Sequence, residues 1–454
     1  MKSTMRLGWM VFTIVLVLAG RFLAFPTLVA AQSQGNNAVY YQSGSSGICC
    51  QGSGAFIDAS MFKGQASDIC GVIYYIFKNS YPSSSAVVDA RGLNSSNTSM
   101  TCAAGTTPWN NGTTTFLNKP STILLPAGTI IIPIPWVLPG YTHLIGVGDS
   151  IVSASGIGTT IQACKSTTPP CTFSGDMIDF GGSPACSSCT DISIENLVLD
   201  GQGQSINGIV NQESQALTYI DHVSLYQILG TGLSVFNSAS HSGPYSNVTF
   251  DTGAYSGVSS TTCANINGLT DTHGLHHWSC KSETNDGAAG ILLDSSNNTL
   301  EDVRLVGFHD GIRVGANATA QSNVLLNIYG DTAGGLTPIN TVHIESVGNT
   351  VTDLSIMGLA NGGGSGTYTL RDDLTSTLLS GASDPSVGIY ALGKSANGGY
   401  SRFTTSPNAA TWGVGSSAPG TTSCSPGSLY SNTGGSPKAL YVCLGSTSQW
   451  SGVK

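Results

Sequence analysis

Charged side chains are scarce in this sequence. Lys and Arg together number 16 and Asp and Glu 25 among 454 residues, or 9% of the chain. Removing the three basic residues of the first thirty-one positions leaves 13 basic against 25 acidic residues, a net charge of −12. Nucleic acids and anionic membranes are bound through clustered Lys and Arg. The charge balance therefore argues against both as partners and fits neutral ligands or a divalent cation.

Long apolar runs are absent beyond the N-terminus. The run "LGWMVFTIVLVLAG" (7–20) follows two basic residues and is short for a membrane span, which needs about 20 residues. Small residues at 29–31 supply a cleavage point. The pattern predicts a cleaved signal peptide over 1–31 and an N-terminal extension over 32–54, with an uncleaved anchor as the alternative. We expect a secreted protein, extracellular or at the cell surface, without membrane insertion after cleavage.

The twelve cysteines form an even set, which in an exported chain predicts disulfides. Nearness in sequence predicts the pairs Cys164–Cys171, Cys186–Cys189, Cys263–Cys280 and Cys424–Cys443, and leaves Cys49, Cys50, Cys70 and Cys102 to pair among themselves. The alternative for "CSSC" (186–189) is a metal site with Cys164 and Cys171, or redox exchange.

An apolar-x-apolar signature recurs through the middle of the chain. It occurs at 197–199, 223–225, 248–250, 278–280, 303–305, 324–326 and 354–356, in steps of 26, 25, 30, 25, 21 and 30 residues. A glycine-led apolar segment follows most of them. Each cycle therefore consists of a strand, a polar turn, a glycine, a second strand and a loop.

Strands this short, with no helix between them, exclude a doubly wound sheet. The two-residue hairpin turns of an antiparallel meander are also lacking. A coil of about 25 residues per turn, with parallel strands stacked about 4.8 Å apart, satisfies both constraints. The predicted fold is all-β: a single-stranded right-handed parallel β-helix over 55–395. "SDICGVIYYIFKNSYP" (67–82) predicts a short N-terminal capping helix with Ser67 or Asp68 as N-cap. The segments 86–92, 121–140 and 142–150 are the first rungs.

The repeat fades after residue 395. Residues 396–420 are rich in Gly, Ser and Thr and predict a linker. Residues 421–454 predict a small disulfide-closed β module. Its Tyr430, Tyr441 and Trp450 are either the core of that module or a substrate-binding platform for sugar rings.

Several phrases occur in a telling order: a capping helix, "VVDARG" (87–92), "ILLPAGTI" (123–130), "HLIGVGDS" (143–150), "TTIQA" (159–163) and "ISIENLVLDG" (192–201). This order resembles the pectate-lyase superfamily of secreted β-helices, which includes pectin-degrading enzymes and phage tailspikes. The resemblance implies action on an extracellular polysaccharide, pectin-like or another acidic glycan, as a lyase or glycoside hydrolase. The alternative is a non-catalytic, glycan-binding or adhesin-type solenoid, because the fold hosts both classes. The oligomeric state is left open.

Alignment of the cycles places Glu195 beside Asp221, and two carboxylates on adjacent rungs can share a calcium ion. "YIDHVSL" (219–225) is similar to the "WIDH" phrase of pectate lyases, with Tyr219 in place of tryptophan. The resemblance implies that Asp221 is a calcium ligand. Calcium is the one cofactor that the sequence suggests, and the alternative is a solvated acidic position.

The same alignment places His276 beside Glu301, His277 beside Asp302 and Ser279 beside Arg304. Both charge signs and imidazoles therefore accumulate in the 278 and 303 cycles. If the protein is an enzyme, we expect its catalytic residues on this strip. The candidates are His277, Glu283, Asp286, Asp302, Arg304, His309 and Asp310, with Asp286 also implied by the resemblance of "SETNDG" (282–287) to the "NTDG" phrase of polygalacturonases.

The densest polar segment, "VRLVGFHDGIRVG" (303–315), favours a turn over an active site. His309 and Asp310 fall at a corner, where Asp-Gly suits left-handed backbone. Arg304 and Arg313 fall on different strands and face different sides, with Arg313 a candidate substrate-binding residue. Carboxylates of the adjacent cycle are expected at the same corner, and a carboxyl pair is the minimum equipment for cleaving a glycosidic bond.

Overall fold

The structure, a computed structural model, describes residues 55–453 except for internal segments. The segments left out are 81–84, 95–98, 113–115, 151–157, 166–170, 172, 256–260, 271–273, 284–288, 332–339, 346–348, 350, 358–367, 373–388, 392–399, 403–410, 416–418, 420–428, 433–439 and 445–448. The predicted signal peptide and N-terminal extension lie outside the described residues, as do Asp286 and Cys424. No helix in the described part of the chain is both long and apolar enough to span a bilayer.

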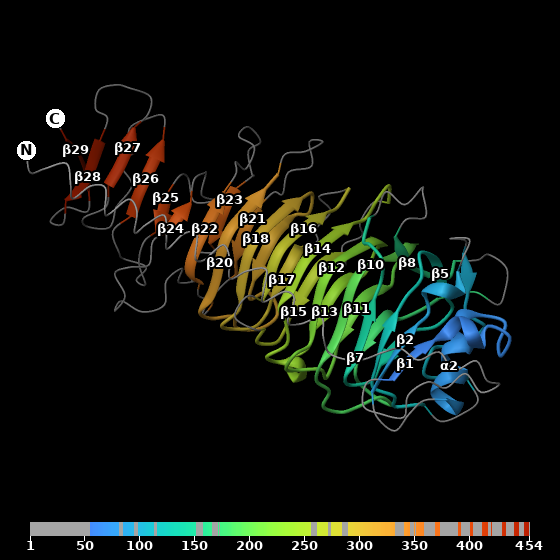
Figure 1. Cartoon of the computed structure of the whole chain (residues 1–454). Helices are drawn as coiled ribbons and strands as arrows, with labels where there is room; N and C mark the ends of the chain where they lie inside the picture. Colours follow the sequence, from blue (N-terminus) through green and yellow to red (C-terminus); the bar gives the residue numbers. More distant parts are fainter. Residues whose placement is uncertain are drawn as a thin grey trace, which may run out of the picture. The chain divides into compact units, whose positions relative to one another are not determined.

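Two long parallel sheets make up most of the fold (Figure 1). The first sheet contains, in spatial order, β1 (Ala55–Asp58), β2 (Ala86–Asp89), β4 (Ser121–Leu124), β7 (Thr142–Ile145), β10 (Ile192–Gln204), β12 (Tyr219–Ile228), β14 (Tyr245–Asp251), β16 (Leu275–Lys281), β18 (Thr299–Val306), β20 (Asn323–Gly330), β22 (Val351–Met357) and β24 (Ile389–Ala391), with β3 (Met100–Thr101), β5 (Gly128–Ile132) and β8 (Thr159–Ala163) on a side branch. The second sheet contains β6 (Trp136–Leu138), β9 (Asp176–Phe180), β11 (Asn207–Asn211), β13 (Thr231–Val235), β15 (Thr262–Ile266), β17 (Ala289–Leu293), β19 (Asp310–Val314), β21 (Asn340–Ile344) and β23 (Tyr368–Asp372).

From β9 to β24 the chain alternates between the two sheets, and each strand pairs in parallel with the strand two positions along. The backbone therefore winds as a coil whose turns stack on one another. This confirms the predicted parallel β-helix.

The register of the first sheet confirms most of the predicted alignment. Leu197, Val223, Val248, Trp278 and Val303 are successive partners along the stack. The 324–326 cycle is an exception, because Val324 pairs with Thr299 and it is Tyr329 that pairs with Arg304. The sequence alignment was therefore four residues out of register here, since three consecutive apolar residues hid the true repeat of 25 residues.

The interior is a column of aligned apolar side chains. Ile194, Ile220, Tyr245, Leu275 and Leu300 occupy one line of the first sheet and are all buried. The lines contributed by both sheets belong to one continuous hydrophobic cluster. Each coil buries its apolar face only against its neighbours, as expected for a solenoid.

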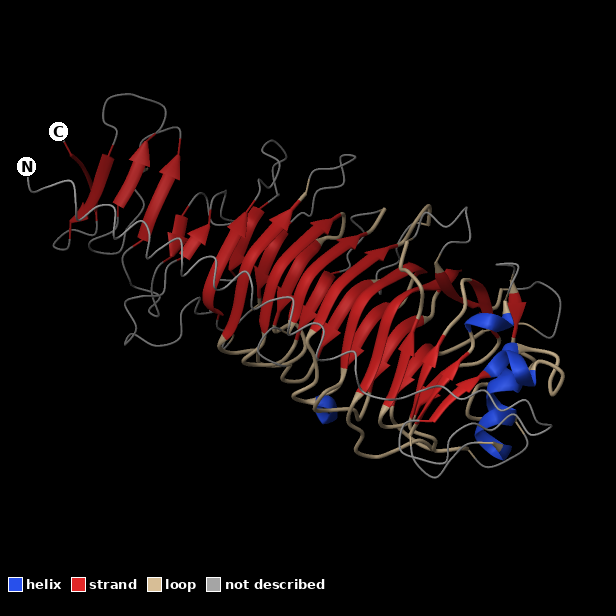
Figure 2. Cartoon of the chain, viewed as in Figure 1, coloured by secondary structure: helices blue, strands red, loops and turns tan. Residues whose placement is uncertain are grey.

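The capping helix is α2 (Ile69–Asn79), which lies beside β1 and β2 (Figure 1). Its N-cap is Asp68, whose carboxylate accepts a hydrogen bond from the backbone N–H of Gly71 at 2.9 Å. Ile73, Ile76 and Phe77 are buried in the hydrophobic cluster of the coils. The other helical segments among the described residues are short 3-10 turns, drawn with α2 in blue in Figure 2: η1 (Ala59–Phe62), η2 (Arg91–Leu93) and η3 (Asn237–Ala239).

A separate sheet follows the coils. It consists of β25 (Tyr400–Arg402), β26 (Thr411–Gly415), β27 (Leu429–Asn432), β28 (Leu440–Leu444) and β29 (Gln449–Val453). Its pairs are antiparallel except β26 with β27. The stretch interpreted as a linker, 396–420, contributes two of these strands, so the C-terminal sheet includes residues on both sides of position 420.

Candidate functional site

A left-handed residue occurs at the same place in six successive coils of the first sheet. The residues are Asn196, His222, Asn247, His277, Asp302 and Asn327, with φ between 53° and 56°. Asn, Asp and His are the side chains that best tolerate this backbone after glycine. In β10 the residues before Asn196 pair with β7 and those after it pair with β8. The left-handed residue therefore bends the strand between two ladders.

The bend breaks the usual in–out alternation of a strand. In each of the six coils the left-handed residue and the residue before it are both at least partly exposed, whereas the flanking residues are buried. Two consecutive side chains per coil consequently face outward. We call this line the bend strip; it comprises Glu195–Asn196, Asp221–His222, Ser246–Asn247, His276–His277, Glu301–Asp302 and Leu326–Asn327.

We expect the backbone of the bend strip to discriminate sharply between substitutions. Asn247→Gly retains left-handed backbone and loses mainly the hydrogen bond from Asn247 Nδ2 to Asp221 Oδ1 (2.8 Å). Asn247→Val adds the cost of a β-branched side chain in that region, so its unfolding free energy should fall by about 2–3 kcal/mol. Urea denaturation measures both, and equal losses would contradict the role given to the bend.

Side chains of the protein already contact both carboxylates that are predicted to bind calcium. Glu195 and Asp221 are register partners, as expected. Glu195 Oε1 accepts hydrogen bonds from the Tyr219 hydroxyl at 2.6 Å and the Ser193 hydroxyl at 3.0 Å. Asp221 Oδ2 lies 3.0 Å from His222 Nδ1. The carboxylates at this end of the strip therefore belong to a network of contacts within the protein. Calcium binding by Glu195 and Asp221 stays a prediction.

The other end of the strip gathers the predicted histidines and carboxylates. His276 pairs in register with Glu301, and its Nδ1 lies 3.3 Å from Glu301 Oε2. His277 Nδ1 lies 3.1 Å from Asp302 Oδ2, and the two imidazole rings are 3.7 Å apart between centroids. Asn327 Nδ2 donates to Asp302 Oδ1 at 2.9 Å. The predicted His277–Asp302 contact is present.

Arg304 and Glu283, two further predicted residues, form their ion pairs outside this cluster. Arg304 is a register partner of Ser279, as expected, and forms an ion pair with Asp331. Glu283 lies 2.5 Å from Lys281, which also contacts Asp251. Both side chains are therefore held by opposite charges. No ion pair or hydrogen bond among the described residues joins either one to Asp302.

Asp310 does not lie with Asp302. It begins β19 in the second sheet, whereas Asp302 lies in β18 of the first. Its side chain is 5% exposed, and Asn340 Nδ2 donates to Oδ1 at 2.5 Å while His343 Nδ1 lies 3.0 Å from Oδ2. Burial raises the pKa of Asp310, but the contacts with His343 and Asn340 outweigh it and leave the pKa below its usual value. Asp310 and Asp302 are not placed as a carboxyl pair.

His309 and Arg313 surround Asp310. His309 Nδ1 lies 3.2 Å from Asp310 Oδ1, and Arg313 forms an ion pair with Glu345. Arg304 and Arg313 lie on different sheets, as predicted for this segment. The sequence does not show that His343, from the following coil, contacts Asp310 at this corner.

The C-terminal aromatics pack against each other. Tyr430 and Tyr441 are 6% and 9% exposed and their rings make an edge contact, with Trp450 5.8 Å from Tyr430. This is the arrangement of a small core, the first of the two interpretations, and a sugar-binding role for these rings stays a prediction.

Sequence reasoning missed a carboxyl pair on β9. Burial, followed by the charge of Asp176 and a hydrogen bond with it, raises the pKa of Asp179 to about 7. Asn207 Nδ2 donates to Asp176 Oδ1 at 2.7 Å. The Asp179 carboxyl therefore stays neutral over much of the acidic range. The sequence "DMIDF" shows two aspartates, but not the burial that couples them.

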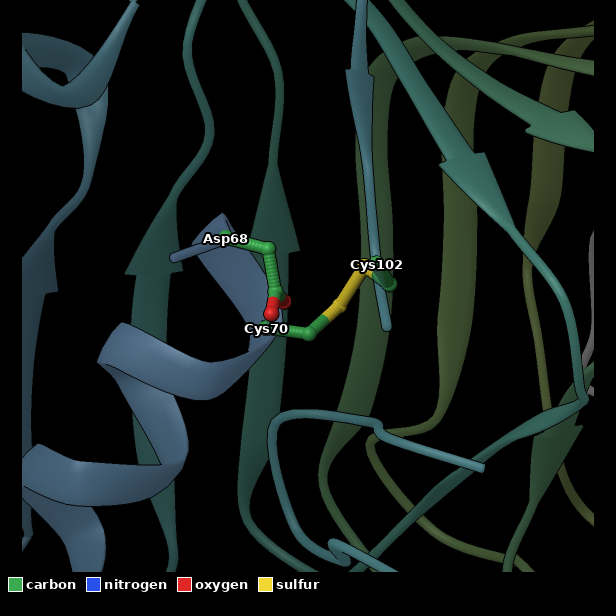
Figure 3. A group of neighbouring side chains, drawn as sticks. All are labelled: Asp68, Cys70 and Cys102. Atoms are coloured by element: carbon green, nitrogen blue, oxygen red, sulfur yellow. A yellow bond between two sulfur atoms is a disulfide. The ribbon is translucent and has the colours of Figure 1, made fainter. Parts of the chain in front are cut away.

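All the described cysteines are disulfide-bonded. Cys164–Cys171, Cys186–Cys189 and Cys263–Cys280 are confirmed, Cys70 is bonded to Cys102, and Cys443 is bonded while its predicted partner Cys424 lies outside the described residues. The "CSSC" sulfurs are therefore not metal ligands here. Figure 3 shows Asp68 beside the Cys70–Cys102 bond; its carboxylate caps α2, so this group has a structural role.

No protein-family model and no curated protein sequence matches the chain. Among solved structures, the A-module of the Azotobacter vinelandii mannuronan C-5 epimerase AlgE4 is 17% identical over 55% of this chain and 85% of its own, with a TM-score of 0.22. The A-module of AlgE6 from the same organism is 16% identical over 55% and 83%, with a TM-score of 0.21. ORF18 of Geobacillus virus E2 is 11% identical over 71% and 55%, with a TM-score of 0.28. Likeness at this level supports no inference about activity.

Proposed function

We propose that this protein binds an extended extracellular polysaccharide along the bend strip. The observation that carries the proposal is the pair of outward side chains that each of six coils presents at one bend. Successive pairs are one rung apart, about 4.8 Å. A linear polymer can therefore meet a hydrogen-bonding group at every rung.

The chemistry of the strip favours a glycan rich in hydroxyls. The strip contains four carboxylates, three imidazoles and three asparagines, and no Lys or Arg. Carboxylate and amide oxygens accept hydrogen bonds from hydroxyls, whereas polyanions would be repelled unless a cation intervened. We therefore favour a neutral glycan over the pectin-like one that the family resemblance implies.

Disulfides support the extracellular setting of the proposal. Four bonds join described cysteines, and such bonds form and persist in oxidising compartments. The N-terminal run expected to be a signal peptide agrees with export.

Binding to a panel of neutral and acidic polysaccharides by affinity electrophoresis tests the proposal. Asp221→Ala combined with Glu301→Ala removes two charged acceptors at positions with ordinary strand backbone. We expect affinity for the bound glycan to fall about tenfold or more, since each charged hydrogen bond contributes about 1.5–3 kcal/mol. Ser234→Ala, on the second sheet, is the matched control and should bind as the wild type does. Unchanged affinity of the double variant would refute the strip as the binding surface.

A second candidate function is cleavage of the bound glycan, as a hydrolase or a lyase. It is favoured by the side-by-side pairs His276–Glu301 and His277–Asp302. Imidazole paired with carboxylate can take or give a proton near neutral pH. Arg304, one of the predicted catalytic residues, is held by Asp331, so an imidazole is the better candidate for the base of a lyase.

The same polysaccharide panel, assayed for unsaturated products and for reducing ends, separates binding from cleavage. Cleavage predicts that Asp302→Asn stops product formation while much of the affinity remains. Binding without either product from any glycan that the protein retains would leave the first function and exclude the second.

A further inference from the structure

His276, His277 and Asp302 bring three metal-ligating atoms together. One nitrogen of each imidazole and one carboxylate oxygen all lie within 4.8 Å of one another. The three side chains come from neighbouring strands, β16 and β18, and are 29%, 52% and 33% exposed. An ion could therefore reach them from solvent.

The left-handed bend explains why these side chains meet. Consecutive residues of a strand normally point to opposite faces. At His277 and at Asp302 the backbone has a φ of 56°, so each of these residues shares the outward face with the residue before it. Two adjacent histidines thus stand above two adjacent carboxylates, Glu301 and Asp302.

The contact distances suit coordination as well as hydrogen bonding. Ligands about 2.0–2.1 Å from one ion lie roughly 3.0–3.4 Å from each other. The separations between His277 Nδ1 and Asp302 Oδ2, 3.1 Å, and between His276 Nδ1 and Glu301 Oε2, 3.3 Å, fall in this range. Each of these two contacts therefore has the spacing of two ligands bound to one ion.

We propose that His276, His277 and Asp302 bind a divalent transition metal of the zinc class, with Glu301 as the nearest further ligand. Two imidazoles and a carboxylate suit zinc, nickel or copper, whereas calcium takes oxygen ligands. The site is thus distinct in place and chemistry from the calcium pair expected at Glu195 and Asp221. It does not depend on glycan binding.

The rest of the strip supplies a matched comparison. His222 has the same left-handed backbone and lies 3.0 Å from the carboxylate of Asp221. Its partner in the next coil is Asn247, which is not a comparable ligand. One imidazole and one carboxylate without the second histidine should bind zinc weakly.

The test is calorimetric titration of zinc into untagged, chelator-treated full-length protein at constant pH, with cobalt absorption as a second readout. We expect one saturable zinc and tetrahedral or five-coordinate cobalt bands. His276→Asn, His277→Asn and Asp302→Asn should each weaken zinc affinity at least tenfold. His222→Asn should leave it within about twofold. Circular dichroism establishes that each variant is folded.

Two results would overturn the proposal. One is zinc titration of the wild type that does not exceed that of the folded His276→Asn/His277→Asn double variant. The other is loss of affinity in His222→Asn equal to that in His277→Asn, which would indicate diffuse binding along the strip. Neither result bears on glycan affinity, which is measured without added metal.

Discussion

Replacing His343 with alanine should lower the free energy of unfolding by about 3 kcal/mol at neutral pH. His343 is 4% exposed and is one of the two close partners that keep the buried carboxylate of Asp310 charged. Removing one partner of a buried charged pair costs roughly 3–5 kcal/mol when the other is left unpaired. Asn340 and His309 remain beside Asp310, so the expected loss is near the lower limit.

Denaturant unfolding of His343→Ala, Asp310→Asn and the double variant measures this coupling. The double variant should be more stable than the sum of the two single losses predicts, because the Asp310→Asn substitution leaves no buried charge behind. His309→Ala, whose ring is 36% exposed, is the control and should cost less than about 1 kcal/mol. Strictly additive losses would show that His343 does not stabilise the Asp310 charge.

The contacts of Asp310 also predict how the stability of the protein changes as the pH is lowered. The pKa of Asp310 is lower in the fold than its ordinary 3.8, so its contribution to stability is present above that value. It is lost as the pH falls through the lower folded pKa. The difference in stability between wild type and His343→Ala should therefore shrink below about pH 4.

Replacing Asp179 with asparagine should stabilise the protein above neutral pH. The folded pKa of about 7 exceeds the ordinary 3.8, so the folded state holds a proton that the unfolded state has lost. Its contribution is fully present below about pH 4 and declines as the pH rises to about 7. Three pKa units correspond to about 4 kcal/mol, and because solvent screening weakens such a contribution at a partly exposed carboxyl we expect a gain of about 2–4 kcal/mol at pH 8.

The measurement is unfolding free energy from pH 4 to pH 8 for wild type and Asp179→Asn. The difference between the two curves should grow through this window and be flat above it. The asparagine amide can still donate to Asp176, so hydrogen bonding is retained. A difference that does not vary with pH would exclude the raised pKa. Asp176→Asn is the matched variant and should reduce this slope without abolishing it, because burial, the largest cause of the raised pKa of Asp179, remains.

The sequence was sufficient for the fold and for pairs of neighbours. The apolar signature at Leu197, Val223, Val248 and Val303 gave the register, and the register alone placed His276 beside Glu301. It failed where the apolar pattern was ambiguous, at Val324. A second signal was present there: Asn, His or Asp recurs at every bend, and Asn327 marks the correct repeat.

The sequence was insufficient for properties that depend on burial and on distant coils. Asp310 was placed at a turn, but its closure by His343 depends on packing thirty-three residues later. The raised pKa of Asp179 depends on how deeply β9 is covered and on the charge of Asp176. Alignment of cycles predicts which residues are adjacent, whereas it gives no measure of water access.

The bend also separates the residues that the fold of each coil requires from the outward residues that can be substituted. The backbone needs only a residue that tolerates left-handed φ, and the flanking buried residues carry the packing. The outward pair can therefore be altered in one coil while the column of apolar side chains stays as it is. The spacing between coils is fixed, whereas the outward side chains can differ from one coil to the next. The chemistry of such a surface can therefore change one coil at a time.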